Sequence, residues 1–285
     1  MLKYLLFAFL FISQIGLAAE GISDYSKYHN LLTIKSPKAL IFDAENGEVI
    51  YQKKAKEKTP IASLTKLMTA MVILDSELDM EKIISISKKD FDRIKGTKSR
   101  LWIGSNLTRK QLLTISLVAS DNRAAYAISN SYPGGKKAFV KAMNVKAKQL
   151  DMFDTNFSDP TGLDKNNIST AFDLVKLTQA AYQYPLIREV STSSFYSVYI
   201  KNKKRKLNYN NTNLLVRQGL WDIEISKTGY IKEAGKCLVM HTKVMDKPVI
   251  MIFLKSFGKY TRTADAKRVK KWLEKVHSES NLALR

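Results

Sequence analysis

Hydrophobic residues follow a strand-like pattern towards both ends of the chain and a helix-like pattern in its middle. Two β-prone runs, at residues 39–42 and 49–51, flank the sequence Glu45-Asn46-Gly47-Glu48. An Asn-Gly pair between such runs predicts a β-hairpin, because both turn residues accept positive φ angles. Further strands are expected at residues 194–200, 222–226, 237–245 and 248–254.

The middle of the chain predicts helices. One begins near Ser63, after Pro60, and carries apolar residues on most of its faces, which is typical of a core helix. Thr170-Ala171-Phe172-Asp173 resembles a capping box that would open a helix reaching about Tyr182. Other helices are expected at residues 108–119, 122–129 and 136–150, and at the C-terminus, where Val269, Trp272, Leu273 and Val276 share one face.

This order of elements predicts an α+β fold. Strands from both chain ends would form one antiparallel sheet flanked by helices, and the middle would form an inserted helical lobe. A chain of 285 residues without internal repeats suits one domain with two lobes. A cleft is expected between the lobes.

The N-terminus has the pattern of a secretory signal peptide. Lys3 precedes an apolar run at residues 5–12, small residues lie before Glu20, and cleavage is expected after Ala18. The alternative is a retained membrane anchor, but the apolar run is short for a bilayer. Residues 1–18 are therefore expected to be removed. The remaining residues 19–285 would act in the periplasm without a stable transmembrane anchor, free or peripherally associated with the cell wall or membrane.

Composition narrows the candidate partners. Lys and Arg number 47 against 26 Asp and Glu, a formal charge of +21, which indicates anionic surroundings. Export argues against nucleic acid and favours cell-wall polymers and anionic lipids. The single cysteine, Cys237, excludes an intramolecular disulfide and is expected to be buried. Three histidines without a His-Glu-x-x-His motif argue against a zinc hydrolase, and no metal or cofactor is expected.

The first candidate catalytic motif is Ser63-Leu64-Thr65-Lys66. At the start of a helix, Ser63 and Lys66 would lie one turn apart on the same face. A serine hydroxyl needs a nearby base, and a buried lysine with a lowered pKa can be one. Ser85-Ile86-Ser87-Lys88 has the same spacing, so this motif alone favours an ordinary amphipathic helix with a surface lysine.

Two further triplets are candidates. Ser120-Asp121-Asn122 lies between two expected helices. Ser120 could relay a proton and Asn122 could hold a substrate amide or orient Lys66, although all three residue types are also good helix caps. Lys227-Thr228-Gly229 follows the strand expected at residues 222–226. There Lys227 would supply positive potential, Thr228 a hydroxyl for a carboxylate, and Gly229 room for close approach; the alternative is an ordinary strand end.

The three motifs together are the set found in penicillin-binding proteins and class A β-lactamases. With them the chain resembles the serine DD-peptidases, the low-molecular-mass penicillin-binding proteins of peptidase family S11. The resemblance runs from residue 39 to residue 276. It is most specific for the DD-endopeptidases of the penicillin-binding protein seven group, through residues 131–135, 211–215 and 234–240.

The resemblance implies a β-lactamase/transpeptidase-like fold and a D-alanyl-D-alanine endopeptidase acting on peptidoglycan cross-links. Lys66 would take the proton of Ser63, which forms the acyl-enzyme, and Ser120 would pass a proton to the departing amine. The backbone N–H groups of Ser63 and Tyr230 would hold the oxyanion. Peptidoglycan stem peptides would be the partners, and β-lactams would be covalent inhibitors.

Three alternatives remain open from the sequence. A D-alanyl-D-alanine carboxypeptidase would trim the terminal D-Ala of pentapeptides, but such relatives commonly carry an arginine where this chain has Thr212. A class A β-lactamase needs a carboxylate base, and residues 154–167 contain no Glu. An inactive cell-wall-binding protein would use the Lys-rich residues 201–206, which otherwise form a solvated loop.

Overall fold

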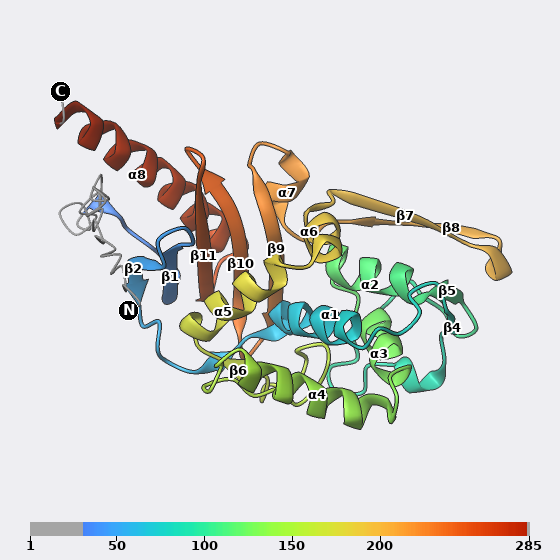
Figure 1. Ribbon diagram of the computed structural model, residues 1–285. Helices are drawn as coiled ribbons and strands as arrows, with labels where there is room; N and C mark the ends of the chain where they lie inside the picture. The colour runs from blue at the N-terminus through green and yellow to red at the C-terminus, as the bar shows by residue number, and fades with distance from the viewer. Residues whose placement is uncertain (1–30, 284–285) are drawn as a thin grey trace, which may run out of the picture.

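The computed structural model describes residues 31–283, and the expected signal peptide at residues 1–18 lies outside them. One five-stranded antiparallel sheet, in the order β2-β1-β11-β10-β9, contains strands from both ends of the chain (Figure 1). This confirms the predicted sheet. Its strands are β1 (Lys38–Asp43), β2 (Glu48–Lys53), β9 (Ile223–Ile231), β10 (Gly235–Val244) and β11 (Lys247–Ser256).

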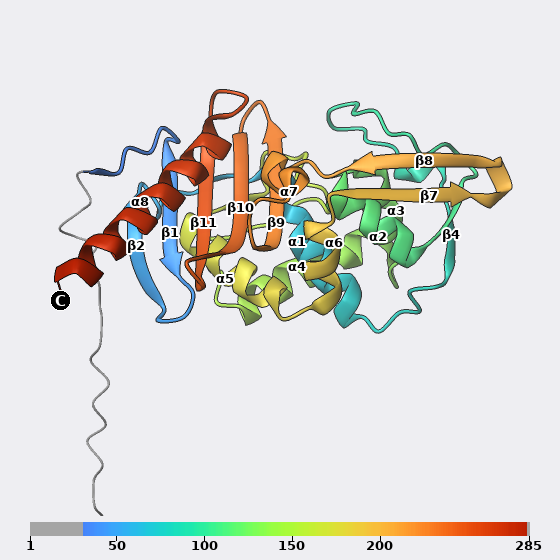
Figure 2. The same cartoon turned by 90° about the horizontal axis from the view of Figure 1, so that it is seen from above.

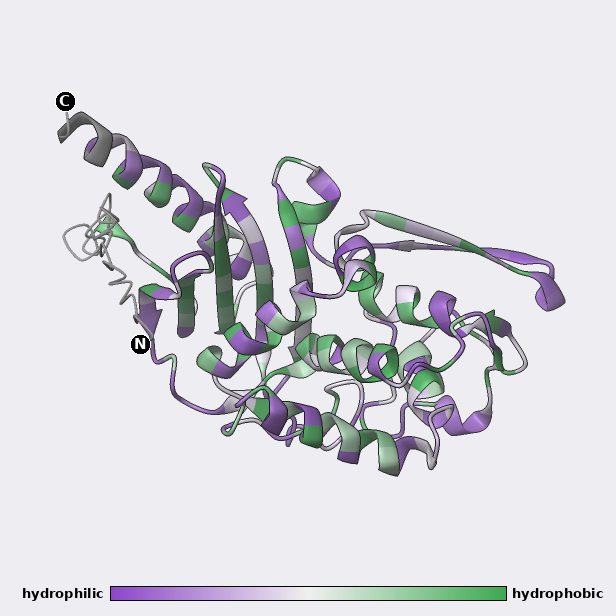
Figure 3. Cartoon of the chain, in the orientation of Figure 1, coloured by the Kyte–Doolittle hydropathy of each residue, from purple (hydrophilic) through white to green (hydrophobic). Residues whose placement is uncertain are grey.

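Alternating side chains of this sheet enter two separate cores. Leu40, Val239 and Ile252 face the helical lobe, where α5 (Ala171–Tyr182) packs on the sheet. The opposite face packs against α8 (Thr261–Ala283), whose buried residues include the predicted stripe of Val269, Trp272, Leu273 and Val276. Figure 3 shows mainly hydrophobic residues along β1 and β11, and hydrophobic and hydrophilic residues in turn along α8.

A buried carboxylate ties α8 to the segment that precedes β1. Asp265 is fully buried and accepts hydrogen bonds from the backbone N–H groups of Lys35, at 2.9 Å, and Ser36, at 2.8 Å. The Ser36 hydroxyl donates to the same carboxylate, and Arg268 forms an ion pair with it. These contacts join the two ends of the described chain.

The helical lobe surrounds α1 (Thr65–Asp75), of which residues 65–73 are all buried. This burial agrees with a helix that is apolar on most faces. Two short strand pairs lie in this lobe, β3 (Thr59–Pro60) with β6 (Ile168–Ser169) and β4 (Ile83–Ser85) with β5 (Asn106–Thr108). The remaining helices are α2 (Arg109–Val118), α3 (Asn122–Asn130), α4 (Gly135–Gln149) and α6 (Pro185–Thr192).

A second hairpin extends away from the sheet along the helical lobe (Figure 2). It pairs β7 (Phe195–Ile200) with β8 (Arg205–Asn210), and α7 (Leu214–Gln218) leads from it to β9. The Lys-rich segment at residues 201–206 forms its exposed tip and the start of β8. Within residues 31–283 no helix combines the length and the hydropathy needed to cross a membrane.

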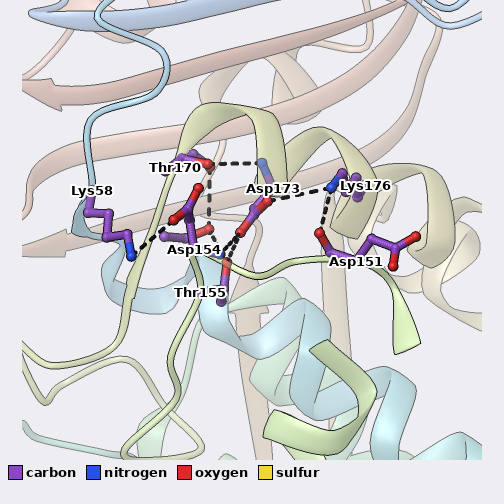
Figure 4. Close-up of polar contacts among 8 residues, drawn as sticks. Lys58, Asp151, Asp154, Thr155, Thr170, Asp173 and Lys176 are labelled. Atoms are coloured by element: carbon purple, nitrogen blue, oxygen red, sulfur yellow. Dashed lines mark hydrogen bonds and ion pairs between the residues drawn. The ribbon is translucent and has the colours of Figure 1, made fainter. Parts of the chain in front are cut away.

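The predicted cap of α5 is half correct. The Thr170 hydroxyl accepts the Asp173 N–H at 3.1 Å, as a capping box requires. The Asp173 carboxylate does not complete the box; it accepts from Asp154 N at 2.9 Å and Thr155 Oγ1 at 2.8 Å (Figure 4). The cap therefore anchors the preceding loop to α5.

Candidate active site

Ser63 lies in a tight turn immediately before α1. The turn, η2 (Ala62–Leu64), is 3₁₀-helical, and Ala62 has a φ of 49°, in the left-handed region. Gly162 packs directly against this turn, since a Cβ at that position would lie 1.8 Å from the Ala62 carbonyl oxygen. The backbone of the serine is thereby held at the edge of the helical lobe.

Lys66 is fully buried one turn along from Ser63. Its Nζ lies 2.9 Å from Ser63 Oγ, 2.7 Å from Asn122 Oδ1 and 2.9 Å from the Thr161 carbonyl oxygen. Burial lowers the pKa of Lys66 to about 8, and the negative charge of Asp159 only partly opposes this shift. A neutral amine has two N–H groups for Asn122 and Thr161 and a lone pair for the Ser63 hydroxyl.

In the Ser120-Asp121-Asn122 triplet, Asp121 caps a helix, whereas Ser120 and Asn122 belong to the cleft. Asp121 is the N-cap of α3 and accepts the Ala124 N–H at 3.0 Å, which explains the capping pattern. Ser120 has a φ of 58°, in the left-handed region, and its hydroxyl accepts from Lys227 Nζ at 2.9 Å. A non-glycine residue in this conformation is strained, which is common where a side chain must be aimed at a site.

Residues 91–100 fix the orientation of Asn122. Asn122 Nδ2 donates to Thr97 Oγ1 at 2.9 Å, and this hydroxyl donates to Asp92 Oδ2 at 2.7 Å. Because the Thr97 proton goes to Asp92, the oxygen can accept from the amide, and Asn122 Oδ1 turns to Lys66. Asp92 also accepts three backbone N–H groups of its own loop.

The Lys-Thr-Gly triplet lies within β9 rather than after a strand. The expected strand end at residue 226 was wrong, because pairing with β10 continues to Ile231. Lys227 is buried and bridges Ser120 Oγ and the Thr228 carbonyl oxygen, each at 2.9 Å. Burial and the positive charge of Lys66 hold the pKa of Lys227 well below its usual value.

The rest of β9 closes the second wall of the site. Thr228 Oγ1 donates to Thr212 Oγ1 at 2.8 Å, and Tyr230 is 60% exposed. A Cβ at Gly229 would lie 2.9 Å from the Ser63 N atom, so this strand and the serine turn touch through the glycine. All eight candidate residues therefore lie along the facing edges of the two lobes: Ser63, Lys66, Ser120, Asn122, Lys227, Thr228, Gly229 and Tyr230.

The second Ser-x-x-Lys match forms no comparable arrangement. Ser85 ends β4 and Lys88 begins the 3₁₀ turn η3 (Lys88–Asp90), and both are exposed.

Cys237 is buried as predicted, and burial raises the pKa of its thiol to about 11. The roles of the Thr161 carbonyl and of the Asp92–Thr97 pair were not predicted from the sequence. A backbone oxygen and residues of an irregular loop form no motif of regular spacing that the sequence could reveal.

Comparisons with known proteins agree with this geometry. Residues 25–258 match the S11 peptidase family, described as D-alanyl-D-alanine carboxypeptidase. D-alanyl-D-alanine endopeptidases from Pseudomonas aeruginosa and Escherichia coli are each 44% identical over 241 residues, which cover 85% of this chain and 78% of each relative.

More distant relatives share the fold. A D-alanyl-D-alanine carboxypeptidase of Bacillus subtilis is 30% identical over 253 residues, 87% of this chain and 64% of that protein. The crystal structure of a Streptomyces DD-transpeptidase superposes with a TM-score of 0.78 at 29% identity, over 84% of this chain and 97% of that one. The chain therefore belongs to the S11 family of D-alanyl-D-alanine peptidases.

Proposed function

We propose that this protein is a serine-type D-alanyl-D-alanine endopeptidase that hydrolyses peptide cross-links of peptidoglycan. The observation that carries the proposal is the contact of 2.9 Å between the buried Lys66 amine and Ser63 Oγ, next to the edge of β9. A lysine with a pKa of about 8 is neutral often enough near neutral pH to act as the base. The site needs no metal or cofactor for this reaction.

In the proposed reaction, neutral Lys66 takes the Ser63 proton while Oγ attacks the carbonyl carbon of a D-alanine residue. The N–H groups of Ser63 and Tyr230 stabilise the oxyanion. When the C–N bond breaks, Ser120 gives its proton to the departing amine and takes back the proton held by Lys66, so that both residues return to their starting protonation states. Water then hydrolyses the ester and regenerates the Ser63 hydroxyl.

Lys227 and Thr228 form no covalent bond in the reaction; they position the reacting groups by hydrogen bonds. The Lys227 amine donates to Ser120 Oγ at 2.9 Å, which supports Ser120 as the group that reaches the departing amine. The Thr228 hydroxyl would contact a substrate carboxylate, and the exposed edge of β9 would align the peptide. Asn122 orients Lys66 through the contact at 2.7 Å.

The endopeptidase assignment is favoured over the carboxypeptidase alternative by two observations. Relatives at 44% identity are called endopeptidases, whereas carboxypeptidases appear at 30%. Thr212, bonded to Thr228 at 2.8 Å, stands where an arginine would pair with a terminal carboxylate. A hydroxyl there leaves room for a continuing chain.

Penicillin and muropeptides test the proposal. The wild type should be labelled covalently by a fluorescent penicillin, and Ser63→Ala should not be; persistent labelling would mean that another residue is the nucleophile. The wild type should split a cross-linked dimeric muropeptide into monomers. Release of D-alanine from a pentapeptide without dimer cleavage would instead establish the carboxypeptidase alternative.

We also propose that the protein works in the periplasm after loss of residues 1–18. Substrates of this class lie outside the cytoplasmic membrane, and the N-terminal pattern is that of a secretory signal. The N-terminal sequence of protein recovered from a periplasmic fraction would test this. A start at Ala19 supports cleavage, and a start at Met1 contradicts it.

A further inference from the structure

A hollow adjoins the catalytic cleft on the side of Ser120. It has a volume of about 470 Å³. Its walls come from three segments, the loop that carries Thr97, the junction between α2 and α3, and β8. The lining residues are Lys98, Ser99, Arg100, Ala119, Ser120, Asp121, Asn122 and Tyr209. Ser120 and Asn122 therefore face both the reaction centre and this hollow.

The hollow carries two cations and one carboxylate. Neither Lys98 nor Arg100 is among the residues that form ion pairs in the part of the chain that the structure describes. Asp121, the acidic residue of the wall, already accepts the Ala124 N–H and, at 2.7 Å, the Ser99 hydroxyl. Because two cations face this one carboxylate, the wall of the hollow keeps a net positive charge.

Arg100 is held in place at the wall. Its guanidinium lies 4.7 Å from the centre of the Tyr209 ring and donates to the Asn208 carbonyl oxygen. An arginine has five N–H donors, so these contacts leave donors for a further acceptor. Lys98 is exposed at the opening and can reach the same acceptor from a flexible stem.

The hollow lies next to the residue that would protonate the departing amine. Ser120, which would protonate that amine, is part of its wall, and Tyr209 lies three residues before Thr212, the partner of Thr228. A departing group that continues beyond the amine would enter this space. A single alanine leaves most of it empty, whereas a peptide that bears a carboxylate matches both its size and its charge.

We propose that this hollow is a subsite for the amine-donating peptide of the cross-link and that Lys98 and Arg100 bind a free carboxylate on it. This inference rests on the proposed endopeptidase function and adds a substrate preference to it. Charge-assisted hydrogen bonds to a carboxylate are stronger than neutral ones, so masking that carboxylate should slow cleavage.

Two synthetic cross-linked dimers test the subsite. They would differ in one group of the amine-donating peptide, a free carboxylate or its primary amide, at a position other than the carboxylate that Thr228 contacts. We expect the wild type to cleave the acid with a kcat/KM about 10-fold above that for the amide. In Lys98→Gln combined with Arg100→Gln the ratio should fall to about one.

Matched variants separate local binding from general effects of charge. Lys206→Gln removes a positive charge from the exposed hairpin and should keep the wild-type ratio, because Lys206 lies outside the hollow. Lys98→Arg keeps the charge and should also preserve the ratio. Thermal melting of each variant reports whether it is folded.

The outcomes are distinguishable. If the wild type cleaves both dimers at the same rate, or the double variant keeps the full preference, the subsite is wrong while the endopeptidase function stands. If Lys206→Gln removes the preference as completely, long-range attraction rather than the hollow is responsible, and the subsite is again refuted. If the wild type cleaves neither dimer and is not labelled by penicillin, the proposed function itself fails.

Discussion

The rate at which Ser63 is acylated should depend on pH through the protonation state of Lys66. Only the neutral amine can accept the serine proton, and burial favours that form by lowering the pKa to about 8. Because the active form is the unprotonated amine, the active fraction grows as pH rises, and the lowered pKa brings this rise close to neutral pH. The acylation rate should therefore increase about 10-fold per pH unit below pH 8 and level off above it.

The size of the gain in neutral Lys66 follows from the lowering of its pKa. With a pKa of about 8, roughly one tenth of Lys66 is neutral at pH 7, whereas the usual value of 10.5 would leave about 1 in 3,000. The buried position therefore raises the active fraction about 300-fold, equivalent to about 3 kcal/mol. Lys227 titrates in the same cluster, so the observed midpoint belongs to the pair.

Single-turnover labelling with a fluorescent penicillin between pH 6 and about pH 9.5 measures this dependence, and Ser63→Ala supplies the background. Lys66→Arg should be inactive across the range, because a guanidinium stays protonated. A rate that is flat over the same range, or one that still rises about 10-fold per pH unit at its upper end, would refute the assignment of Lys66 as the base.

Other expected outcomes test individual contacts. Thr97→Val should slow acylation about 10-fold by releasing the amide that it orients, and Thr97→Ser, which keeps the hydroxyl, should restore the rate under the same labelling assay. Gly229→Ala should nearly abolish labelling because its Cβ would lie 2.9 Å from the Ser63 N atom; normal labelling would show that the strand can shift. Asp265→Asn should lower the free energy of unfolding by about 1–3 kcal/mol in urea titrations, and an unchanged midpoint would contradict its anchoring role. Cys237 should react with a thiol reagent only after unfolding, since it is buried and its pKa is raised; rapid reaction of the native protein would contradict this.

Elements with a strong local signal were predictable. The Asn46-Gly47 turn and the periodic α4 appear where the sequence places them, because their geometry is set by neighbouring residues. The strand β8 was missed, since Lys and Asn residues alternate there with only Leu207 and Tyr209 on the buried side. Such a strand depends on its partner β7 more than on its own composition.

The candidate site likewise contains residues that could be predicted from the sequence and residues that could not. Side chains that belong to spaced motifs, such as Ser63 and Lys227, could be named from the sequence because the motifs constrain residue types. The groups that position them could not. The Thr161 carbonyl is a backbone atom, and Thr97 reaches Asn122 only through the path of a loop folded around Asp92.

The close packing around Ser63 limits how this enzyme can change. The backbone of residues 62 and 63 is pressed between Gly162 on one side and Gly229 on the other, where added side chains would come within 1.8 Å and 2.9 Å of it. Mutations that confer antibiotic tolerance while sparing cell-wall cleavage are therefore expected at the open rim, at positions such as Tyr230, and seldom at either glycine.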